Sequence, residues 1–304
     1  MEITCPICHG VKTGNIAKFR YENPIFSNCS LAKCQDCEMI FASPMPSETA
    51  LFAYNANYFL AAHGGRPTSR MAVAFFAGIA LIRLAFVNRF LERHHIVVNR
   101  VLEVGPGPGL FARSWLQQFP QTTYLAIETD EGCRQPLEEL GVQLVASADV
   151  ESVDLVVMSH VLEHVPDPVK FVRDMTMGLR SGGALFIEVP CRDWEHKALD
   201  EPHILFFDKI SMRRLLDDLG FIDVEIAYYG QTIAQLKTES KFHSILMRVR
   251  ARLISWGLVA PFATTSAGME TLVDPLQRAM VAPYKAHLES DEPAWWLRAV
   301  ARKL

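Results

Sequence analysis

The sequence predicts an α/β fold in which a mostly parallel sheet carries helices on both faces and a small lobe precedes it. From residue 98 onward, short apolar stretches typical of buried strands alternate with helical stretches. This alternation implies right-handed crossovers between parallel strands. One strand runs through a glycine-rich turn, Gly105–Gly109, into a helix. Two Cys-x-x-Cys pairs near the N-terminus predict a small unit held by a metal ion.

Length and composition fit one large domain with an appendage, or two domains. The chain has 304 residues, half of them hydrophobic, and a formal net charge of −4 at pH 7. This charge gives no electrostatic reason to expect nucleic acid as the main partner. The first residues lack a basic region followed by an apolar run. We therefore expect a cytoplasmic protein with reduced cysteines.

The cysteine pairs are Cys5 with Cys8 and Cys34 with Cys37. Each pair can form a tight knuckle, and four thiolates complete a tetrahedral zinc site that has no open position. A lobe of about 45 residues buries little core, so a bound ion would contribute much of its folding free energy. The expectation is a zinc-binding lobe over residues 1–45, with a structural zinc ion that takes no part in catalysis.

A long apolar stretch over residues 71–91 is expected to be a helix buried against the sheet or at a dimer contact. Its uninterrupted apolar run, Met71–Ile82, is shorter than the roughly 18 residues that a membrane span requires. Arg83 follows directly. We therefore expect no membrane span, while weak contact with an apolar surface or acceptor stays open.

The glycine turn has the properties of a ligand site. Val101, Leu102 and Val104 suit a buried strand, and glycines allow backbone conformations and a close approach that side chains would prevent. Small ligands bind where such a turn leaves the carboxyl end of a parallel strand. The spacing, Gly-x-Gly-x-Gly, differs from the usual dinucleotide fingerprint. The next predicted strand, 123–127, ends at Glu128, whose carboxylate can accept hydrogen bonds from two ribose hydroxyls.

Three motifs in this order resemble those of class I S-adenosylmethionine-dependent methyltransferases. They are residues 103–109 (Glu-Val-Gly-Pro-Gly-Pro-Gly), Glu128, and residues 154–164 (Asp-Leu-Val-Val-Met-Ser-His-Val-Leu-Glu-His). The resemblance covers residues 98–230 and implies a Rossmann-like fold with a mostly parallel, seven-stranded sheet. It implies a methyltransferase domain over 98–304, in which residues 235–292 are a helical insertion before a closing strand at 293–304.

The resemblance also implies that S-adenosylmethionine is the cofactor. The glycine turn would line its methionine part, and Glu128 would hold its ribose. The residues assigned to the cofactor on this basis are Glu103, Gly105, Pro106, Gly107, Gly109, Glu128, Thr129, Asp149, Ser159 and His160.

Residues 46–97 are expected to form a helical lid and linker. Similar zinc-knuckle leaders precede the catalytic domain in a subset of small-molecule methyltransferases, in which the following segment folds over the cofactor pocket. Tyr54 and Tyr58 are therefore candidate substrate contacts. Packing between the lobe and the domain is the alternative role for both.

Two histidines are candidates for a general base, because a hydroxyl, enol or amine acceptor must lose a proton. His203 matches the second histidine of a His-Glu-His-Phe stretch in deoxysugar C-methyltransferases, although Glu201 and Pro202 replace the two residues before it. His164 and Glu163 resemble an acidic and histidine pair of quinone O-methyltransferases, which sometimes use a divalent ion. Glu163 is accordingly a candidate substrate or metal contact. Loop packing for His203 and helix capping for His164 are the alternatives.

The expected function is methyl transfer to O, N or C of a small-molecule acceptor that is sugar, natural-product or quinone-like. One alternative is an RNA-modifying methyltransferase whose zinc lobe reads RNA. Another is a non-catalytic binding protein on the same fold. Arg248, Arg250 and Arg252 are interpreted as a solvated helix face, with an anionic substrate group as the alternative. We expect a monomer or a homodimer.

Overall fold

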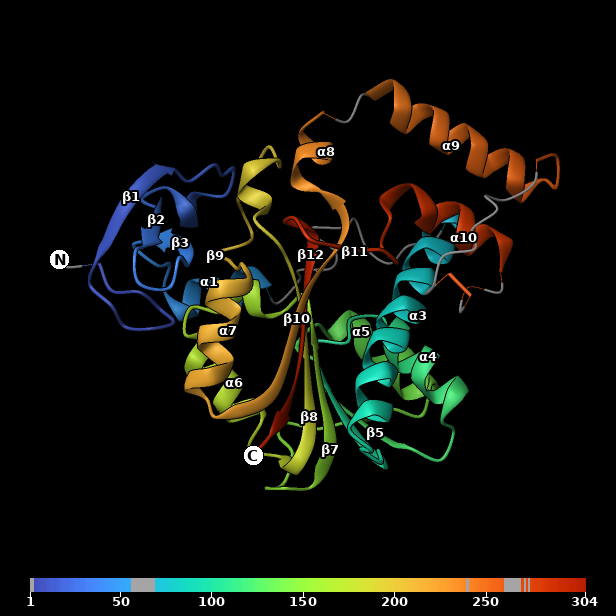
Figure 1. The fold of residues 1–304 in the computed structure, drawn as a ribbon, viewed down its shortest axis with the longest axis horizontal. Helices are drawn as coiled ribbons and strands as arrows, with labels where there is room; N and C mark the ends of the chain where they lie inside the picture. The colour runs from blue at the N-terminus through green and yellow to red at the C-terminus, as the bar shows by residue number, and fades with distance from the viewer. Residues whose placement is uncertain (1–2, 56–68, 239–240, 260–268, 271, 273) are drawn as a thin grey trace.

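The computed structural model describes residues 3–55, 69–238, 241–259, 269–270, 272 and 274–304. A central sheet carries helices on both faces, and a small lobe lies against one end (Figure 1). Helices α3, α4 and α5 cover one face, and α6 and α7 cover the other. The helices are α1 (Glu48–Asn55), α3 (Arg70–Arg93), α4 (Leu110–Gln118), α5 (Glu131–Glu139), α6 (Pro168–Met175), α7 (Lys209–Asp218), α8 (Ile233–Thr238), α9 (Lys241–Ser255) and α10 (Pro275–Val281).

The sheet has the strand order β11-β10-β12-β8-β7-β4-β5-β6. From β8 to β6 all neighbours are parallel, whereas β12 runs antiparallel between β10 and β8. This arrangement confirms the predicted mostly parallel sheet and the closing strand, but within the described residues the sheet has eight strands where seven were predicted. The additional strand is β11, which lies in the segment predicted as a helical insertion and pairs with β10. The bounds are β4 (Arg100–Val104), β5 (Thr123–Ile127), β6 (Gln143–Leu144), β7 (Val153–Ser159), β8 (Leu179–Pro190), β10 (Phe221–Thr232), β11 (Glu289–Ser290) and β12 (Ala294–Lys303).

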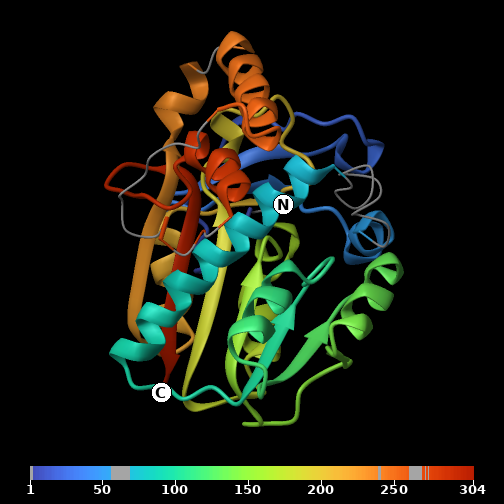
Figure 2. The same cartoon turned by 90° about the vertical axis from the view of Figure 1, so that its right-hand side faces the viewer.

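Helix α3 runs diagonally across the sheet (Figure 2). Within the part of the chain that the structure describes, it is the one helix long and apolar enough to cross a membrane. Phe86, Val87 and Phe90 are nevertheless buried in the core shared with α4 and the sheet. Burying large apolar side chains is the main favourable term in such packing, at roughly 1.5–3 kcal/mol each. The apolar stretch therefore packs on the sheet as a core helix.

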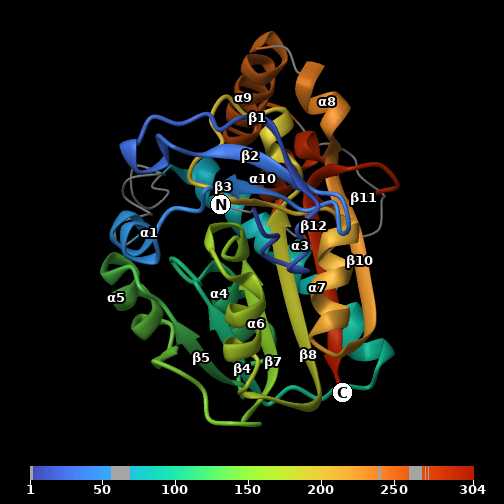
Figure 3. The same ribbon diagram turned by 90° about the vertical axis from the view of Figure 1, so that its left-hand side faces the viewer.

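The lobe forms a second sheet of order β1-β2-β3-β9. Its first three strands are β1 (Thr13–Lys18), β2 (Ser30–Cys34) and β3 (Ile40–Ser43), and they cross above α6 and α7 (Figure 3). The fourth, β9 (Leu205–Phe206), comes from the loop that follows β8. The lobe predicted at residues 1–45 therefore completes its sheet with a strand from the larger domain.

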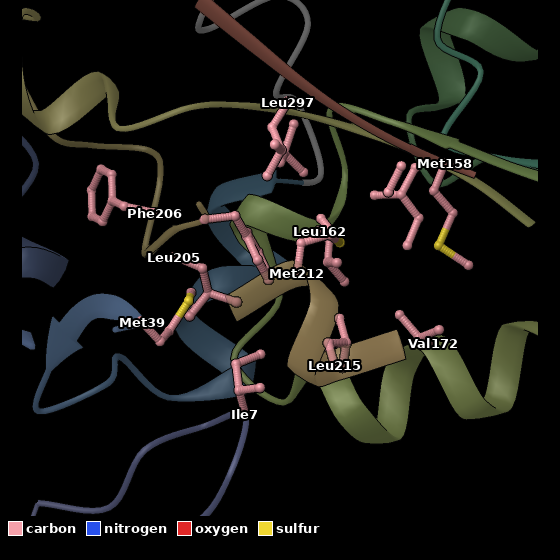
Figure 4. Packing of buried hydrophobic residues seen from close by; sticks show 14 of the residues in the cluster. Ile7, Met39, Met158, Leu162, Val172, Leu205, Phe206, Met212, Leu215 and Leu297 are labelled. Carbon is pink, nitrogen blue, oxygen red and sulfur yellow. The ribbon is translucent and has the colours of Figure 1, made fainter. Parts of the chain in front are cut away.

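One hydrophobic core joins the lobe to the sheet (Figure 4). Ile7 and Met39 of the lobe belong to the same buried cluster as Leu205 of β9 and Met212 of α7. The cluster continues to Leu297 of β12. Because the core is continuous, the lobe is held rigidly against the loop between β8 and α7.

Candidate active site

The glycine turn leaves β4 at the carboxyl end of the parallel strands. Gly105, Gly107 and Gly109 have φ of +66°, +55° and +75°, a conformation that favours glycine. A Cβ on Gly105 would lie 2.7 Å from the side chain of Val161, and one on Gly109 would lie 2.8 Å from that of Leu137. Gly105 is exposed, so its backbone is open to a ligand, while Pro106 beside it is buried.

Glu128, at the end of β5, is directed to the glycine turn. Its Oε2 accepts a hydrogen bond from the backbone N–H of Gly107 at 2.8 Å, and its Oε1 accepts one from Asp130 at 2.8 Å. A carboxylate has about four acceptor positions, so capacity remains for two ribose hydroxyls. Burial raises the pKa of Glu128. Thr129, which follows, is exposed.

Glu103 lies inside β4, below the turn. It is 3% exposed, and its Oε2 accepts a hydrogen bond from the Tyr124 hydroxyl at 2.7 Å. Burial raises the pKa of Glu103 to about 7. This bond links the neighbouring strands β4 and β5, so the structure gives Glu103 a core position under the site.

Asp149 lies at the other end of the sheet, and this corrects its assignment to the cofactor. Its backbone oxygen is 3.3 Å from where a Cβ on Gly178 would stand, just before β8 begins. Asp149 also precedes β7, which runs parallel to β8. The chain between β6 and β7 has therefore already reached the amino ends of the parallel strands at Asp149. The glycine turn lies at the carboxyl ends of these strands.

Ser159 and His160 end β7 next to the glycine turn. The Oγ of Ser159 is buried and has no hydrogen-bond partner among the described residues, so a ligand bound here would satisfy it. His160 has φ +57° and bridges two carboxylates: Nδ1 is 3.3 Å from Glu163 Oε1, and Nε2 is 3.2 Å from Glu188 Oε1. Burial lowers the pKa of His160, but the two carboxylates outweigh this and raise it.

These residues fit S-adenosylmethionine. A Cβ at Gly105 or Gly109 would overlap neighbouring atoms. The carboxylate of Glu128 stands at the turn, and the orphaned hydroxyl of Ser159 stands at the adjacent strand end. This combination suits a ligand that carries a ribose and approaches the backbone closely.

Glu163 lies at the centre of a cluster of histidines. It belongs to the short helix η2 (Leu162–His164) and is 1% exposed. Besides the contact with His160, its Oε1 lies 3.9 Å from His164 Nε2 and 4.0 Å from His203 Nε2. Burial raises the pKa of Glu163, but the surrounding histidines outweigh it and lower that pKa to about 2. Burial lowers the pKa of His164 to about 4. At neutral pH the carboxylate is thus charged and His164 is neutral.

His203 is held by Asp193, a residue that the sequence analysis did not select. Nδ1 of His203 is 2.5 Å from Asp193 Oδ2, and both side chains are buried. Burial raises the pKa of Asp193, but His203 and Lys197 outweigh it and hold that pKa below its usual range. The ionised Asp193 therefore accepts a hydrogen bond from the Nδ1–H of His203, which leaves Nε2 as the basic atom. The sequence feature that could have indicated this partner is that Asp193 lies in the same long polar loop as His203.

The lobe fixes the loop that carries His203. The backbone N–H of Arg20 donates to Asp200 Oδ2 at 2.6 Å, and its Nε donates to the same carboxylate. Glu201 accepts hydrogen bonds from the backbone of Glu22 and Asn23. The backbone N–H of His203 in turn donates to the Asp200 carbonyl at 3.1 Å. The lobe thus acts as a clamp on the histidine loop.

Of the two tyrosines proposed to line the site, Tyr54 packs on the lobe. It is half-buried in α1, and its ring meets Phe26 edge-on at 5.5 Å. Burial, together with the charge of Glu201, raises its pKa. Tyr58 lies outside the described residues.

The sequence analysis also did not predict a buried ion network behind His160. Glu188 of β8 is fully buried and accepts hydrogen bonds from Arg83 of α3 at 2.7 Å and from Arg298 of β12 at 2.6 Å. Burial raises the pKa of Glu188, but the two arginines outweigh it and keep that pKa well below its usual range. The sequence feature that could have indicated this network is a charged residue, Arg83, Glu188 or Arg298, inside each of three apolar segments. The network anchors α3 to the strand ends that carry the site.

The four cysteines come together in the lobe. The Sγ atoms of Cys5 and Cys37 are 3.5 Å apart, those of Cys8 and Cys34 are 3.6 Å apart, and all four lie within 4.8 Å of one another. Zinc–sulfur bonds of about 2.3 Å in a tetrahedron place sulfur atoms about 3.8 Å apart. The donor set and its spacing therefore fit a zinc ion.

Comparison with known proteins identifies the family. A family described as "Methyltransferase domain" matches residues 78–226. A trans-aconitate 2-methyltransferase of Rhodopseudomonas palustris is 23% identical over 217 residues, which cover 64% of this chain and 80% of that protein. A ubiquinone biosynthesis O-methyltransferase of Xanthomonas euvesicatoria is 35% identical over 117 residues (35% of this chain, 48% of that protein).

A third relative is a probable S-adenosylmethionine-dependent methyltransferase of Mycobacterium tuberculosis. It is 30% identical over 158 residues, which cover 45% of this chain and 57% of that protein. The chain thus spans only about half the length of the second and third relatives. The family match lies on the segment that builds the glycine turn, Glu128 and the end of β7. This chain belongs to the class I S-adenosylmethionine-dependent methyltransferases.

Proposed function

We propose that the chain methylates a small molecule whose acceptor atom must lose a proton, and that His203 is the base. The observation that carries the proposal is the buried His203–Asp193 pair beside Glu163, at the edge of the sheet where ligands bind. Two relatives are named for methylation of trans-aconitate and for ubiquinone biosynthesis, which favours a small-molecule acceptor for this chain as well.

The residues around His203 have different roles in removing the proton from the acceptor. S-adenosylmethionine, when bound, supplies an electrophilic methyl group. Asp193 accepts a hydrogen bond from Nδ1–H of His203, so Nε2 of His203 is free to take the proton from an acceptor hydroxyl, enol or amine. The charged Glu163, 4.0 Å from Nε2, stabilises the imidazolium that results. The lobe clamp holds the loop in place while this occurs.

The test measures S-adenosylhomocysteine release with a panel of small hydroxylated, enolic and amine acceptors. For an accepted substrate, His203→Gln should lower turnover by about 10²–10⁴-fold, with unchanged affinity for S-adenosylhomocysteine by calorimetry. The matched control is His94→Gln at the far end of α3, where the imidazole lies near Asp223. Turnover by His203→Gln at the wild-type rate would refute the proposal. The position of the new methyl group in the product identifies O, N or C transfer.

A second candidate for the same step uses a divalent cation. It is favoured by the metal-ligating atoms of Glu163, His164 and His203, which lie within 4.8 Å of one another. Two histidines and one carboxylate form a known ligand set for divalent metals. Enzyme that keeps the zinc of the cysteine cluster but is freed of other divalent cations should then be inactive and recover on titration with Mn²⁺ or Mg²⁺. Full activity of that zinc-retaining, otherwise cation-free enzyme would leave the His203 base as the remaining candidate.

We infer that the four-cysteine cluster holds one structural zinc ion. The sulfur spacing supports this, because it is close to the edge of a zinc–sulfur tetrahedron. A closed set of four thiolates leaves no position for a substrate. Native mass spectrometry should find one zinc per chain in the purified protein and none in Cys34→Ser.

A small-molecule acceptor is also favoured over RNA by the charges of the lobe. Lys12 is 3.9 Å from Asp36, and Lys33 is 3.8 Å from Glu38, so both lysines have acidic neighbours. Arg20 is engaged by Asp200. A lobe that reads RNA would need basic side chains free to meet phosphates. Filter binding with a salt titration checks this, and tight salt-dependent binding would restore the RNA alternative.

A further inference from the structure

Helix α9 presents apolar side chains to solvent. Ile245, Leu246 and Val249 are 58%, 50% and 52% exposed, and Trp256 and Leu258, just past the helix, are 64% and 69% exposed. These five residues are named the α9 apolar surface. They are five of the seventeen large hydrophobic residues exposed in the described chain, so exposed apolar area is concentrated on one short segment. Such concentration marks an interaction site.

The positions of these side chains are set by helix α9 and by the turn that ends it. Residues 245, 249 and 256 repeat at helical spacing and share one side of the helix. Ala251 and Ile254, on the other side, are buried. After the helix, the N–H of Gly257 bonds the carbonyl of Ile254, and that of Leu258 bonds the carbonyl of Leu253 at 3.0 Å. This pair of bonds, with Gly257 at φ +74°, is a Schellman turn that fixes Trp256 and Leu258 in place.

The basic residues of this segment indicate that the partner of the α9 apolar surface is negatively charged. Residues 241–259 contain four basic residues, Lys241, Arg248, Arg250 and Arg252, and no acidic residue, whereas the whole chain carries −4. Arg252 is exposed on the helix. An apolar stripe with cationic residues and a tryptophan at its end is typical of helices that lie in the surface of an anionic membrane. A second copy of the same helix would meet it with like charge, which disfavours self-association.

The surface lies at the same end of the molecule as the candidate site. β10 runs antiparallel to β12, as β8 does, so the carboxyl ends of β8 and β10 share one edge of the sheet. The chain enters α8 directly from β10, and Lys237 of α8 is 2.6 Å from Glu195, next to the loop that carries Asp193. Figure 1 shows α9 beyond this edge, away from the amino ends of the strands.

We propose that α9 docks the protein on an anionic membrane surface, with the α9 apolar surface inserted among the headgroups and Arg252 against lipid phosphates. In this orientation the edge that carries His203 and the glycine turn faces the bilayer. The docking depends on α9 alone, so it stands or falls independently of the His203 base.

The experiment is sedimentation of the full chain with vesicles of phosphatidylcholine, with and without phosphatidylglycerol. We expect the protein to bind the anionic vesicles, with binding that weakens as salt is raised. Arg252→Gln should weaken binding about fivefold, and Val249→Ser with Trp256→Ser should weaken it about tenfold or more. Val150→Ser is the matched control, because Val150 is 69% exposed but precedes β7 at the amino ends of the strands.

Tryptophan quenching by brominated lipid tests the insertion directly. Wild type should be quenched on anionic vesicles, whereas Trp256→Phe should bind but lose most of the quenching. Circular dichroism and affinity for S-adenosylhomocysteine should match wild type for each variant, because α9 lies outside the cofactor residues. Absence of vesicle binding, equal binding to neutral vesicles, or unchanged binding by the Val249 and Trp256 double variant would overturn the proposal in favour of a protein partner.

Discussion

At the scale of single residues, the position of His203 depends on Asp193. Asp193 is buried, and its carboxylate contacts both His203 and Lys197. Asp193→Asn keeps the shape but removes the charge that orients the imidazole and stabilises its protonated form. We expect a fall in kcat of about 100-fold or more, with little change in KM or in S-adenosylhomocysteine affinity. Steady-state kinetics and calorimetry measure this, and Glu195→Gln in the same loop is the control. A variant that changes only KM would argue against a role for Asp193 in positioning the base.

Glu103 predicts a pH dependence of stability. Burial raises its pKa to about 7 from the usual value of 4.5. The folded state therefore holds the proton more tightly than the unfolded chain. The resulting stabilisation is fully present below pH 4.5 and is lost as pH rises through 7. The loss approaches about 3 kcal/mol in the free energy of unfolding.

Thermal unfolding at a series of pH values between about 4.5 and 8 checks this prediction. Wild type should lose more stability over that range than Glu103→Gln, which cannot titrate. Glu131→Gln, at a carboxylate whose side chain is 81% exposed, should follow the wild-type curve. Parallel curves for wild type and Glu103→Gln would contradict the buried, proton-holding carboxyl group.

At the scale of elements, the contact between the lobe and the histidine loop couples two segments far apart in sequence. Asp200 is fully buried, and Arg20 reaches it with its backbone and its guanidinium. Arg20→Ala leaves the buried carboxylate with fewer donors, which costs about 1–3 kcal/mol. We expect faster proteolysis of the loop and a lower kcat, with zinc content unchanged.

Asp200→Asn should have a similar effect, and the double variant should lose less than the sum of the two single variants, because the residues interact. Lys12→Ala is the control within the lobe, since Lys12 is exposed and 3.9 Å from Asp36. Strictly additive effects would mean that the pair does not hold the loop.

At the scale of the whole molecule, the N-terminal lobe, which carries the proposed zinc site, supports the candidate site through the core. Ile7 and Met39 pack in one cluster with Leu205 and Met212 (Figure 4). Removal of the proposed zinc ion should loosen the lobe, because the ion would join the two cysteine pairs, Cys5 with Cys8 and Cys34 with Cys37, at their positions in this core. β9 and the histidine loop would then lose their support, while the glycine turn and Glu128 stay on the sheet.

We therefore expect zinc-free protein, or Cys34→Ser, to lose turnover but to keep its affinity for S-adenosylhomocysteine within a few-fold. Metal analysis, activity and calorimetry on the same preparation check this. Turnover that survives complete loss of zinc would show that the lobe does not position the loop. A large loss of cofactor affinity would instead mean that the lobe supports the sheet itself.

Local patterns determined the fold class and half of the candidate site. The alternation of strands and helices predicted the sheet, and the Gly-x-Gly-x-Gly turn with Glu128 predicted a ligand edge. These features are readable because each depends on a short stretch: a strand that turns through glycines into a helix, or a carboxylate at the end of the next strand. The assignment of Asp149 to the cofactor was wrong because it also depended on a local pattern, an acidic residue near a strand. The end of the sheet at which such a residue lies depends on where the chain turns back.

The tertiary structure decided which side chains meet. Asp193 and His203 are neighbours because the loop folds back on itself, and Glu163 reaches them from the end of a different strand. Arg83, Glu188 and Arg298 come from a helix and two strands. The fourth strand of the lobe comes from residues 205–206. The sequence by itself therefore determined the class of fold, the cofactor edge and the four cysteines proposed to bind zinc, since these depend on spacing within short segments. The proposed base, its partner and the clamp that holds them depend on long-range contacts, whose geometry no local pattern carries.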